Sequence, residues 1–426
     1  MDKTVEGKAF VNGNFVNCCI AIKDGKITDI KKLLKSSDHI AFKNRIIIPS
    51  AIDLHVHFRD PGFTHKEDFK SGSIAAAFGG VSCVFDMPNT NPQTTTVQSI
   101  SEKRINASKK SFVDFGIYAG IDNTNIENIK HLSKDCSCFK IYLGSTTNNL
   151  LFDKKNLETA IQNISKTTKT VFFHAEDNDC LNKNRIIENN LNDHLKARPS
   201  ICEEISINNI LNSSKNIESN LHICHLSSCE GLELLKGRPK NVSCGATPHH
   251  LLLSIEKVKN NSFYKVNPPI RSSFDKEALF NSLVNSDIDV VESDHAPHML
   301  SEKEEEFVKA PSGIPGVETM YPLFLCLAKK GFISYERLFS CMCKKPAEIV
   351  KIPKGKIDVG YDADFIVIDL KKDSKIDVNK LHSKSGWSPF VGWPAIFPSD
   401  LFIRGERIIQ DYEIQVSQGF GRFVGE

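Results

Sequence analysis

The stretch Ile46–Gly62, IIIPSAIDLHVHFRDPG, combines an apolar run with two histidines one residue apart. A run of apolar and β-branched residues of this length predicts a buried strand. His55 and His57 come at its end, and alternate residues of a strand point to the same face. Both imidazoles can therefore reach a single metal ion if the strand end tilts them together. A lone histidine pair is more often structural, so further ligand residues elsewhere in the chain are needed to indicate a metal site.

Seven more short apolar or β-branched runs follow, separated by segments long enough to form helices. With the first, the runs are Ile46–His57, Val81–Met87, Phe112–Ala119, Cys138–Leu143, Thr170–His174, Asn220–His225, Asn241–Ala246 and Ile288–Ser293. Eight strand-and-helix units are the number that closes a (β/α)8 barrel. We therefore predict an α/β protein with a TIM-type barrel over residues 49–353.

Most of these runs end in a polar side chain that can take part in chemistry. The residues at or just beyond the ends are His55, His57, Asn89, Lys140, His174, His225 and Asp294. In a (β/α)8 barrel the carboxyl ends of the strands meet at one rim, where active sites form. The sequence therefore predicts that these side chains converge on one site.

The two ends of the chain follow a different rhythm. Residues 1–48 hold short apolar stretches separated by Asn12-Gly13 and Asp24-Gly25, which are tight-turn signals between antiparallel strands. Residues 354–426 return to short strands. We predict that both flanks pair into one small β-sandwich subdomain beside the barrel.

Charge and composition exclude several kinds of partner. Lys and Arg number 54 and Asp and Glu 52, so no net field would gather nucleic acid or an anionic membrane. No apolar run reaches membrane-spanning length, and the N-terminus lacks the order of a signal peptide. The 13 Cys follow no secreted-scaffold or zinc-finger spacing, which favours reduced thiols. We expect a cytoplasmic protein whose partner is a small molecule.

Metal-ligand residues on several strand ends favour a metal site over chance histidines. His174, His225 and Asp294 would join the first histidine pair. Asp294 could also carry a proton from an attacking water to a leaving nitrogen, a role for which His295 competes. A protonated Lys140 has no lone pair for a metal, but its carbamate with CO2 has two anionic oxygens that can bridge two cations. The alternative for Lys140 is a buried lysine in a salt bridge.

Other residues near the predicted rim fit recognition of an anionic substrate. Arg59 can bind a carboxylate through two N–H groups, and Asn89 can add a neutral donor. Arg271 is a second candidate, although either arginine alone would more often form a surface ion pair. His298, beyond the eighth strand, is well placed to touch a substrate.

Two segments after the eighth strand bear on the site. Residues 301–309 are charged and rich in Glu, which is typical of a solvated helix or loop, although their position leaves room for a mobile cover. The Gly-rich stretch 312–316 lacks the Lys-Ser/Thr ending of a phosphate-binding loop. Its backbone could instead hydrogen-bond a flat ring.

The motifs of the chain resemble those of the dihydroorotase branch of the amidohydrolase superfamily. The resemblance begins with Asp53–Gly62, DLHVHFRDPG, and extends over nearly the whole chain. It continues through Met87–Thr90, Phe139–Ile141, His174–Asp177, His222–His225, Pro248–His250, Asn267–Pro269, Asp294–His298 and Gly313–Gly316. Because the motifs are specific and keep the family's order, the chain is identified as a member.

This resemblance implies an enzyme that interconverts dihydroorotate and N-carbamoyl-L-aspartate in pyrimidine biosynthesis with two zinc ions per chain. One ion would be held by His55, His57 and Asp294, and the other by His174 and His225. Lys140 as N6-carboxylysine and a hydroxide would bridge them, as in the carbamylated-lysine branch. Asp294 would act as general base and then as acid.

The resemblance also implies how the substrate is held. Arg59, Asn89 and His298 would hold the exocyclic carboxylate, while Asn267 and the backbone at Gly313 would contact the ring. A homodimer and an association with aspartate transcarbamoylase are further expectations.

Two alternatives stay open at this point. A hydantoinase or allantoinase would use the same metals, but Arg59 and Asn89 favour a substrate with a carboxylate, because the site would otherwise bury an unpaired cation. An inactive relative that serves as a scaffold for aspartate transcarbamoylase would be expected to lose metal ligands. This chain has all six of the ligand residues named above.

Overall fold

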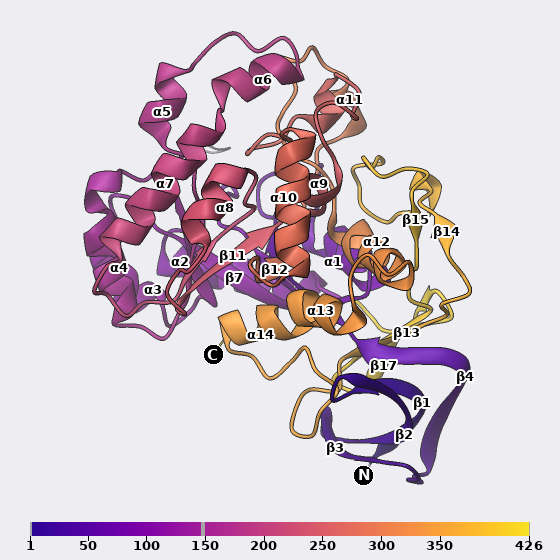
Figure 1. Ribbon diagram of the computed structural model, residues 1–426. Coiled ribbons are helices and arrows are strands. Elements are labelled where there is room, and N and C mark those ends of the chain that lie inside the picture. Colours follow the sequence, from indigo (N-terminus) through magenta and orange to yellow (C-terminus); the bar gives the residue numbers. More distant parts are fainter. Residues whose placement is uncertain (1, 146–149, 426) are drawn as a thin grey trace.

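A sheet of eight parallel strands runs in chain order through the centre of the protein in a computed structural model, which describes residues 2–145 and 150–425 (Figure 1). The strands are β5 (Ala51–Val56), β6 (Val81–Asp86), β7 (Asp114–Gly120), β8 (Cys138–Tyr142), β9 (Val171–His174), β10 (Leu221–Ile223), β11 (Val242–Ala246) and β12 (Val290–Val291). Each pairs in parallel with the next. Each of the eight predicted runs contains one of these strands, but the first run is divided, because Ile46–Pro49 belongs to β4 (Asp38–Pro49) of a second sheet.

The sheet closes where its first strand meets the segment after the last. A parallel bridge joins Val56 to His295, and the N–H of His57 donates to the carbonyl oxygen of His295 at 2.8 Å. The Asp53 carboxylate strengthens the same seam, because its Oδ1 accepts from Ser293 N at 3.0 Å. The predicted (β/α)8 barrel is confirmed.

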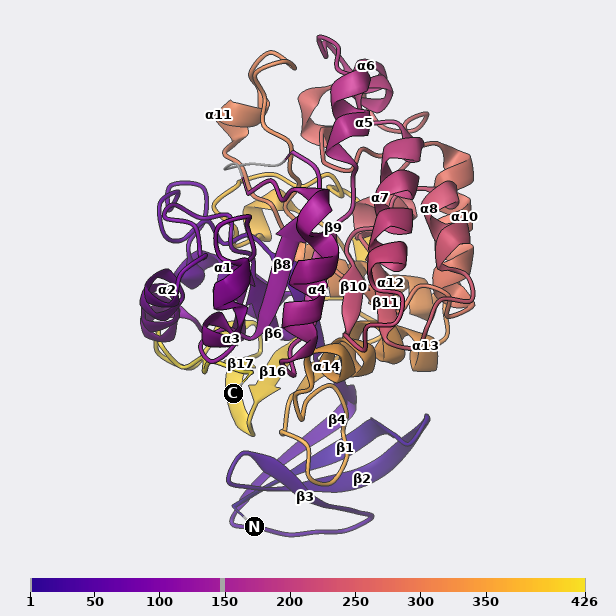
Figure 2. The same cartoon turned by 90° about the vertical axis from the view of Figure 1, so that its left-hand side faces the viewer.

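Helices surround the barrel on its sides and at its ends (Figures 1 and 2). They are α1 (Phe69–Phe78), α2 (Val97–Lys110), α3 (Ile129–Leu132), α4 (Leu157–Ser165), α5 (Asn178–Lys183), α6 (Leu191–Ala197), α7 (Ser200–Ser213), α8 (Cys229–Leu235), α9 (Pro248–Leu252), α10 (Ser273–Val284), α11 (Leu300–Lys303), α12 (Val317–Lys329), α13 (Tyr335–Phe339) and α14 (Lys345–Val350), with a π-helical turn, η4 (Ser340–Lys344), between the last two. Among the described residues, none of the helices is both long and apolar enough to cross a membrane.

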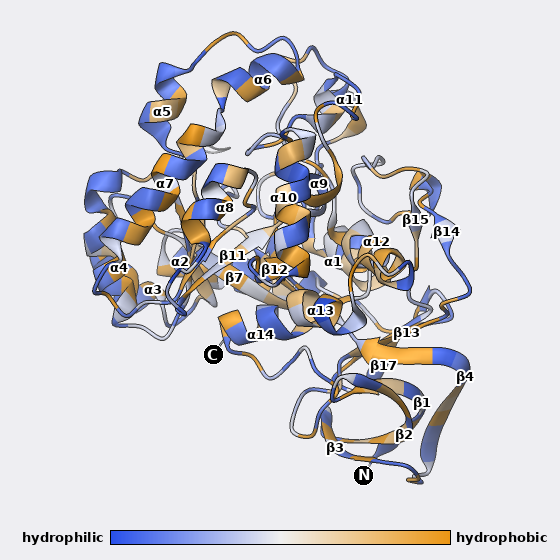
Figure 3. Cartoon of the chain, viewed as in Figure 1, coloured by the Kyte–Doolittle hydropathy of each residue, from blue (hydrophilic) through white to orange (hydrophobic). Residues whose placement is uncertain are grey.

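Helix α4 illustrates why the helices form and pack as they do. Leu157, Ala160, Ile161 and Ile164 are buried, and this spacing puts them on one face of the helix. Figure 3 shows hydrophilic residues on the same helix, as expected where the other face meets solvent. The strands that such helices cover are buried on both faces, which explains why most of their residues are apolar.

The two flanks of the chain build one mixed sheet with the order β18-β17-β16-β13-β4-β1-β2-β3. Its strands are β1 (Lys3–Val11), β2 (Asn14–Lys23), β3 (Lys26–Lys31), β4 (Asp38–Pro49), β13 (Phe365–Ile368), β16 (Asp400–Ile403), β17 (Glu406–Gln410) and β18 (Glu413–Ile414); β14 (Ser374–Lys375) pairs separately with β15 (Pro394–Ala395). Strand β4 joins the two flanks, because it pairs with β1 on one side and β13 on the other. The predicted pairing of the flanks is confirmed, while the boundaries at residues 48 and 353 stay a prediction.

The predicted tight turns lie between strands β1 and β2 and between β2 and β3. Asn12 and Gly13 have φ angles of 49° and 81°, and Asp24 and Gly25 have 51° and 78°. Asn-Gly and Asp-Gly tolerate this left-handed backbone, which matches the twist of the flanking strands. Figure 2 shows the resulting sheet at the opposite end of the barrel from α5, α6 and α11.

The expectation of reduced thiols is wrong for one pair of cysteines. Cys180 at α5 and Cys202 at α7 form a disulfide, with their Cα atoms 5.3 Å apart. The packing of the two helices brings together residues that are 22 positions apart in the chain. Cysteine spacing alone does not reveal such pairing.

Candidate active site

A narrow pocket with about 50 Å³ of free space opens at the carboxyl ends of the barrel strands. It is lined by His55, His57, Arg59, Asn89, Tyr142, His174, His225, Val266, Asn267, Asp294, Ala296, Ser312 and Gly313. The structure therefore brings together most of the residues that the sequence places at the site. Lys140, His298 and Arg271 are the predicted site residues that do not line it.

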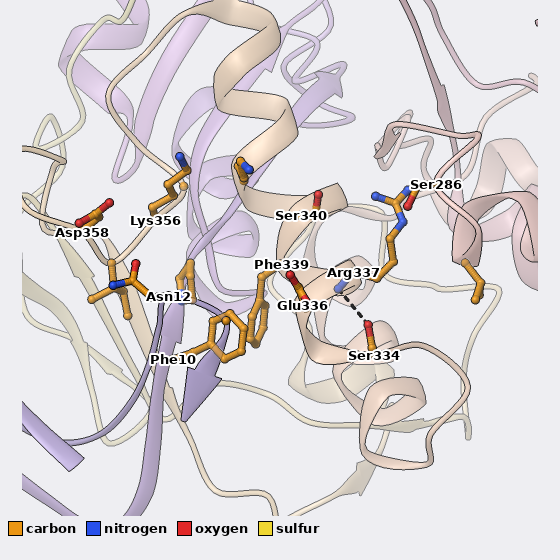
Figure 4. A pocket seen from close by; sticks show the side chains of 16 residues that line it. Phe10, Asn12, Ser286, Ser334, Glu336, Arg337, Phe339, Ser340, Lys356 and Asp358 are labelled. Atoms are coloured by element: carbon orange, nitrogen blue, oxygen red, sulfur yellow. Dashed lines mark hydrogen bonds between the residues drawn. The ribbon is translucent and has the colours of Figure 1, made fainter. Parts of the chain in front are cut away.

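A larger cavity, of about 570 Å³, lies away from this rim (Figure 4). Phe10 and Asn12 of the flanking sheet and Pro49, just before β5, form part of its wall. Since Pro49 precedes the first barrel strand, this cavity is at the amino end of the barrel. None of its lining residues is a histidine, so we place the candidate site in the smaller pocket.

His55, His57 and Asp294 surround one point of the pocket. Asp294 Oδ1 lies 3.3 Å from His55 Nε2 and 3.1 Å from His57 Nε2. His57 Nδ1 lies 2.7 Å from Asn89 Oδ1, and an amide oxygen only accepts hydrogen bonds, so Nδ1 carries the proton. The Nε2 lone pair then faces a carboxylate oxygen. A cation between these groups would relieve the repulsion.

His174 and His225 form a second pair of donors. Glu176, which is held by Arg198 at 2.5 Å, lies 2.9 Å from His174 Nε2. The carboxylate accepts the Nε2 proton and leaves the lone pair on Nδ1, which lies 3.1 Å from His225 Nε2. A carboxylate behind a histidine is a common support for a metal ligand.

Burial keeps these four imidazoles neutral, which metal binding requires. It lowers the pKa of His55 to about 4, lowers that of His174, and holds those of His57 and His225 well below the ordinary value. Burial also raises the pKa of Asp294. A carboxylate with a raised pKa is a better proton acceptor than an exposed one.

Lys140 lies below the pocket and is fully buried. Its Nζ is 3.0 Å from Cys224 Sγ, and none of the described carboxylates forms a salt bridge with it. The alternative of a buried, salt-bridged lysine is therefore not supported. Four neutral imidazoles, a carboxylate and a lysine without an ionic partner fit a centre for divalent cations.

Three residues of the site adopt a left-handed backbone that only glycine takes up easily. Arg59, His225 and Asp294 have φ angles of 61°, 39° and 45°. Such strain costs about 1–3 kcal/mol per residue and is concentrated at functional sites. The surrounding fold therefore holds these three residues in a backbone conformation that they do not favour on their own.

Arg59 presents a cation to the pocket without a partner anion. The residue is only 4% exposed, its Nε has no hydrogen bond, and none of the described carboxylates lies within salt-bridge distance. Burial lowers the pKa of Arg59, yet a guanidinium remains charged in proteins. Asn267 Oδ1 is also buried without a hydrogen bond. These groups can bind an anion and a polar ring.

His298 supports Arg59 from outside the pocket. Lys66 Nζ lies 3.1 Å from His298 Nδ1, and an ammonium only donates, so Nδ1 is the acceptor. Nε2 then carries the proton and donates to Ser312 O at 3.1 Å. The contact between Nε2 and Arg59 Nη2, at 3.3 Å, is therefore no hydrogen bond. Arg59 keeps its donors for a ligand.

Arg271 is not brought to the pocket. Its guanidinium is buried and donates to Ser227 Oγ at 2.9 Å and to Arg198 O at 3.1 Å. These contacts fasten neighbouring loops behind His174 and Glu176. The sequence shows an arginine near a motif, but it does not show where the long side chain points.

Tyr142 lines the pocket and was missed in the sequence. Its hydroxyl is buried and has no hydrogen bond among the described residues, and its ring lies 5.2 Å from Lys140 Nζ. The available signal was its spacing, because residues two apart on a strand share a face. Tyr142 can donate to a substrate oxygen.

The chain is similar to known proteins over its full length. Residues 46–394 match the model described as "Amidohydrolase family". A protein named dihydroorotase from Methanosarcina acetivorans is 36% identical, with 98% of this chain and 94% of that protein covered. Another from Thermoplasma acidophilum is 38% identical, with 100% and 98% covered. A solved structure titled L-hydantoinase (dihydropyrimidinase) from Arthrobacter aurescens has a TM-score of 0.94 and 29% identity and covers 100% of both chains.

Proposed function

Because the chain belongs to the amidohydrolase family and to its dihydroorotase branch, we propose that it reversibly hydrolyses (S)-dihydroorotate to N-carbamoyl-L-aspartate in pyrimidine biosynthesis. The observation that carries this choice of substrate is the buried guanidinium of Arg59, which has no salt bridge among the described residues. A buried cation without an anion is costly. The exocyclic carboxylate of dihydroorotate would supply that anion, whereas hydantoin and allantoin have none.

Two zinc ions fit the donors of this site. His55, His57 and Asp294 would hold one ion and His174 and His225 the other, with Lys140 as the bridging N6-carboxylysine. Bound zinc supplies a Lewis acid that polarises the ring carbonyl and lowers the pKa of water. Metal analysis of protein purified without chelators should find about two zinc ions per chain, and an active preparation free of metal would contradict the assignment.

The residues of the chain then perform binding and proton transfer. Arg59 and Asn89 bind the carboxylate, and Asn267 and the backbone at Gly313 orient the ring. Asp294 accepts a proton from the attacking water and delivers it to the ring nitrogen as the carbon–nitrogen bond breaks. Its buried position beside two histidines suits both steps.

A hydantoinase is the second candidate, because the L-hydantoinase structure superposes over the whole chain. The test is to offer dihydroorotate, hydantoin, dihydrouracil and allantoin side by side and to follow loss of each ring. We expect turnover of dihydroorotate to dominate. Faster opening of hydantoin would overturn the proposed substrate. A homodimer, an association with aspartate transcarbamoylase and a cytoplasmic location stay predictions.

A further inference from the structure

Lys303, in the charged segment after the eighth strand, is fully buried. The sequence favours a solvated segment here, yet the Nζ of this lysine donates to three carbonyl oxygens. They belong to Lys265 at 3.3 Å, Pro311 at 2.8 Å and Gly313 at 3.1 Å. The ring of Trp387 lies 5.5 Å from the same ammonium. None of the described carboxylates forms a salt bridge with Lys303.

A second lysine fastens the same segment. Lys265 Nζ donates to Phe307 O at 2.8 Å and Ala310 O at 3.0 Å, and Lys265 O accepts from Gly313 N at 2.9 Å. The carbonyl groups of the segment therefore point inward to two ammonium groups. These hydrogen bonds hold the segment in a fixed position.

The fastened segment forms one side of the active-site pocket through Ser312 and Gly313. Gly313 has a φ of +150°, and a Cβ there would lie 2.5 Å from Ala296 O and 2.9 Å from the His298 ring. Ser312 O accepts a hydrogen bond from the N–H at His298 Nε2. Together with the contact from Lys66 Nζ to Nδ1, this hydrogen bond fixes the His298 ring beside Arg59, so the position of the wall affects the carboxylate site.

The cation at this position has a cost that an apolar side chain would avoid. Burial, with a smaller contribution from Lys265, lowers the pKa of Lys303 to about 7. Replacing buried charged groups by well-packed apolar side chains is often neutral or stabilising. The three carbonyl groups explain why an ammonium suits the position, since no apolar side chain can hold them.

We propose that Lys303 is a positioning residue of the active site, which fixes the Ser312–Gly313 wall and so keeps Arg59 ready for the substrate carboxylate. The proposal rests on the proposed function only for the choice of assay substrate. Lys303 does not line the pocket and takes no part in bond breaking.

The test compares zinc-loaded Lys303→Met with Lys309→Met. Lys309 belongs to the same segment, but its side chain is 63% exposed, and within the described part of the chain it pairs with Glu306 alone. We expect Lys303→Met to raise the KM for dihydroorotate about tenfold, the effect of losing roughly one good hydrogen bond in the site, while kcat changes little. Lys309→Met should leave both unchanged. An unaltered KM in folded Lys303→Met would overturn the proposal, even if its melting temperature fell.

Hydrogen exchange supplies a readout that does not depend on turnover. Amides of residues 304–313 should exchange faster in Lys303→Met than in the parent protein, with no change in strands β5 to β9. If the parent opens no dihydroorotate, the proposed function fails, but exchange still decides whether Lys303 fixes the wall.

If Lys303→Met does not fold, Lys265→Met serves instead. It removes the bonds to Phe307 and Ala310 and should raise exchange there; unchanged exchange would contradict the fixed wall.

Discussion

Buried charged residues gather at both ends of the barrel, but some of the buried cations at the rim lack an ionic partner among the described residues. At the amino end, Lys354 binds Asp114 at 2.7 Å, Asp362 at 2.9 Å and Asp364 at 2.7 Å, and Arg404 also pairs with Asp114. At the rim, Arg59 and Lys140 have no salt bridge among the described residues. Paired charges hold the structure together, while unpaired ones mark the site that awaits a ligand.

The comparison is tested most strongly by Asp294→Asn. The amide keeps the shape of the side chain but cannot accept the proton, so turnover should fall by about 10²–10⁴-fold. Steady-state assays of zinc-loaded protein would measure the loss. Circular dichroism and zinc content serve as controls for folding and metal binding, and near-normal turnover would remove Asp294 from the mechanism.

A substitution at the amino end should lower stability and leave turnover unchanged. Lys354→Met leaves Asp114, Asp362 and Asp364 without their shared cation, so the free energy of unfolding should fall by about 3–5 kcal/mol. Urea unfolding measures the change, and kcat of the folded fraction should stay the same. Lys26→Met is the matched control, because Lys26 pairs with Asp362 at the surface, where a salt bridge is worth about 0–1 kcal/mol. A loss no larger than that of the control would contradict the role of Lys354.

The residues at the rim could be predicted from the sequence, but the ion pairs at the amino end could not. His55, His174 and Asp294 each lie at or just beyond the end of a predicted strand. Because parallel strands share a direction, their ends predict one common rim of a barrel. Lys354 and Asp114 are 240 positions apart and belong to no motif, so only packing reveals their pairing. Three other features escape prediction because each depends on tertiary packing. They are the Cys180–Cys202 disulfide, the inward carbonyl groups around Lys303 and the direction of Arg271.

Arg59→Met tests whether a buried cation without a salt bridge at the rim binds the substrate carboxylate. Removing the unpaired guanidinium should raise the KM for dihydroorotate about 10–100-fold, since a charge-assisted pair with the carboxylate is lost. Any slow turnover of dihydrouracil, which lacks the carboxylate, should not decrease. The exposed Arg185 provides a control in Arg185→Met. Equal losses for both substrates, or an unchanged KM for dihydroorotate, would show that Arg59 does not bind the carboxylate.

The smallest expected effect is a pH dependence confined to the amino end. The three aspartates raise the pKa of Lys354 well above its ordinary value, although burial opposes them. A raised folded-state pKa stabilises the protein fully below the unfolded value of about 10.4 and is lost as pH rises through the folded value. The stability difference between the parent and Lys354→Met should therefore stay constant from pH 7 to 10 and begin to shrink above it, by at most about 1.4 kcal/mol per pH unit. Taking the difference removes titrations that both proteins share. A difference that already shrinks between pH 7 and 9 would show that Lys354 is not held as a charged partner of these aspartates.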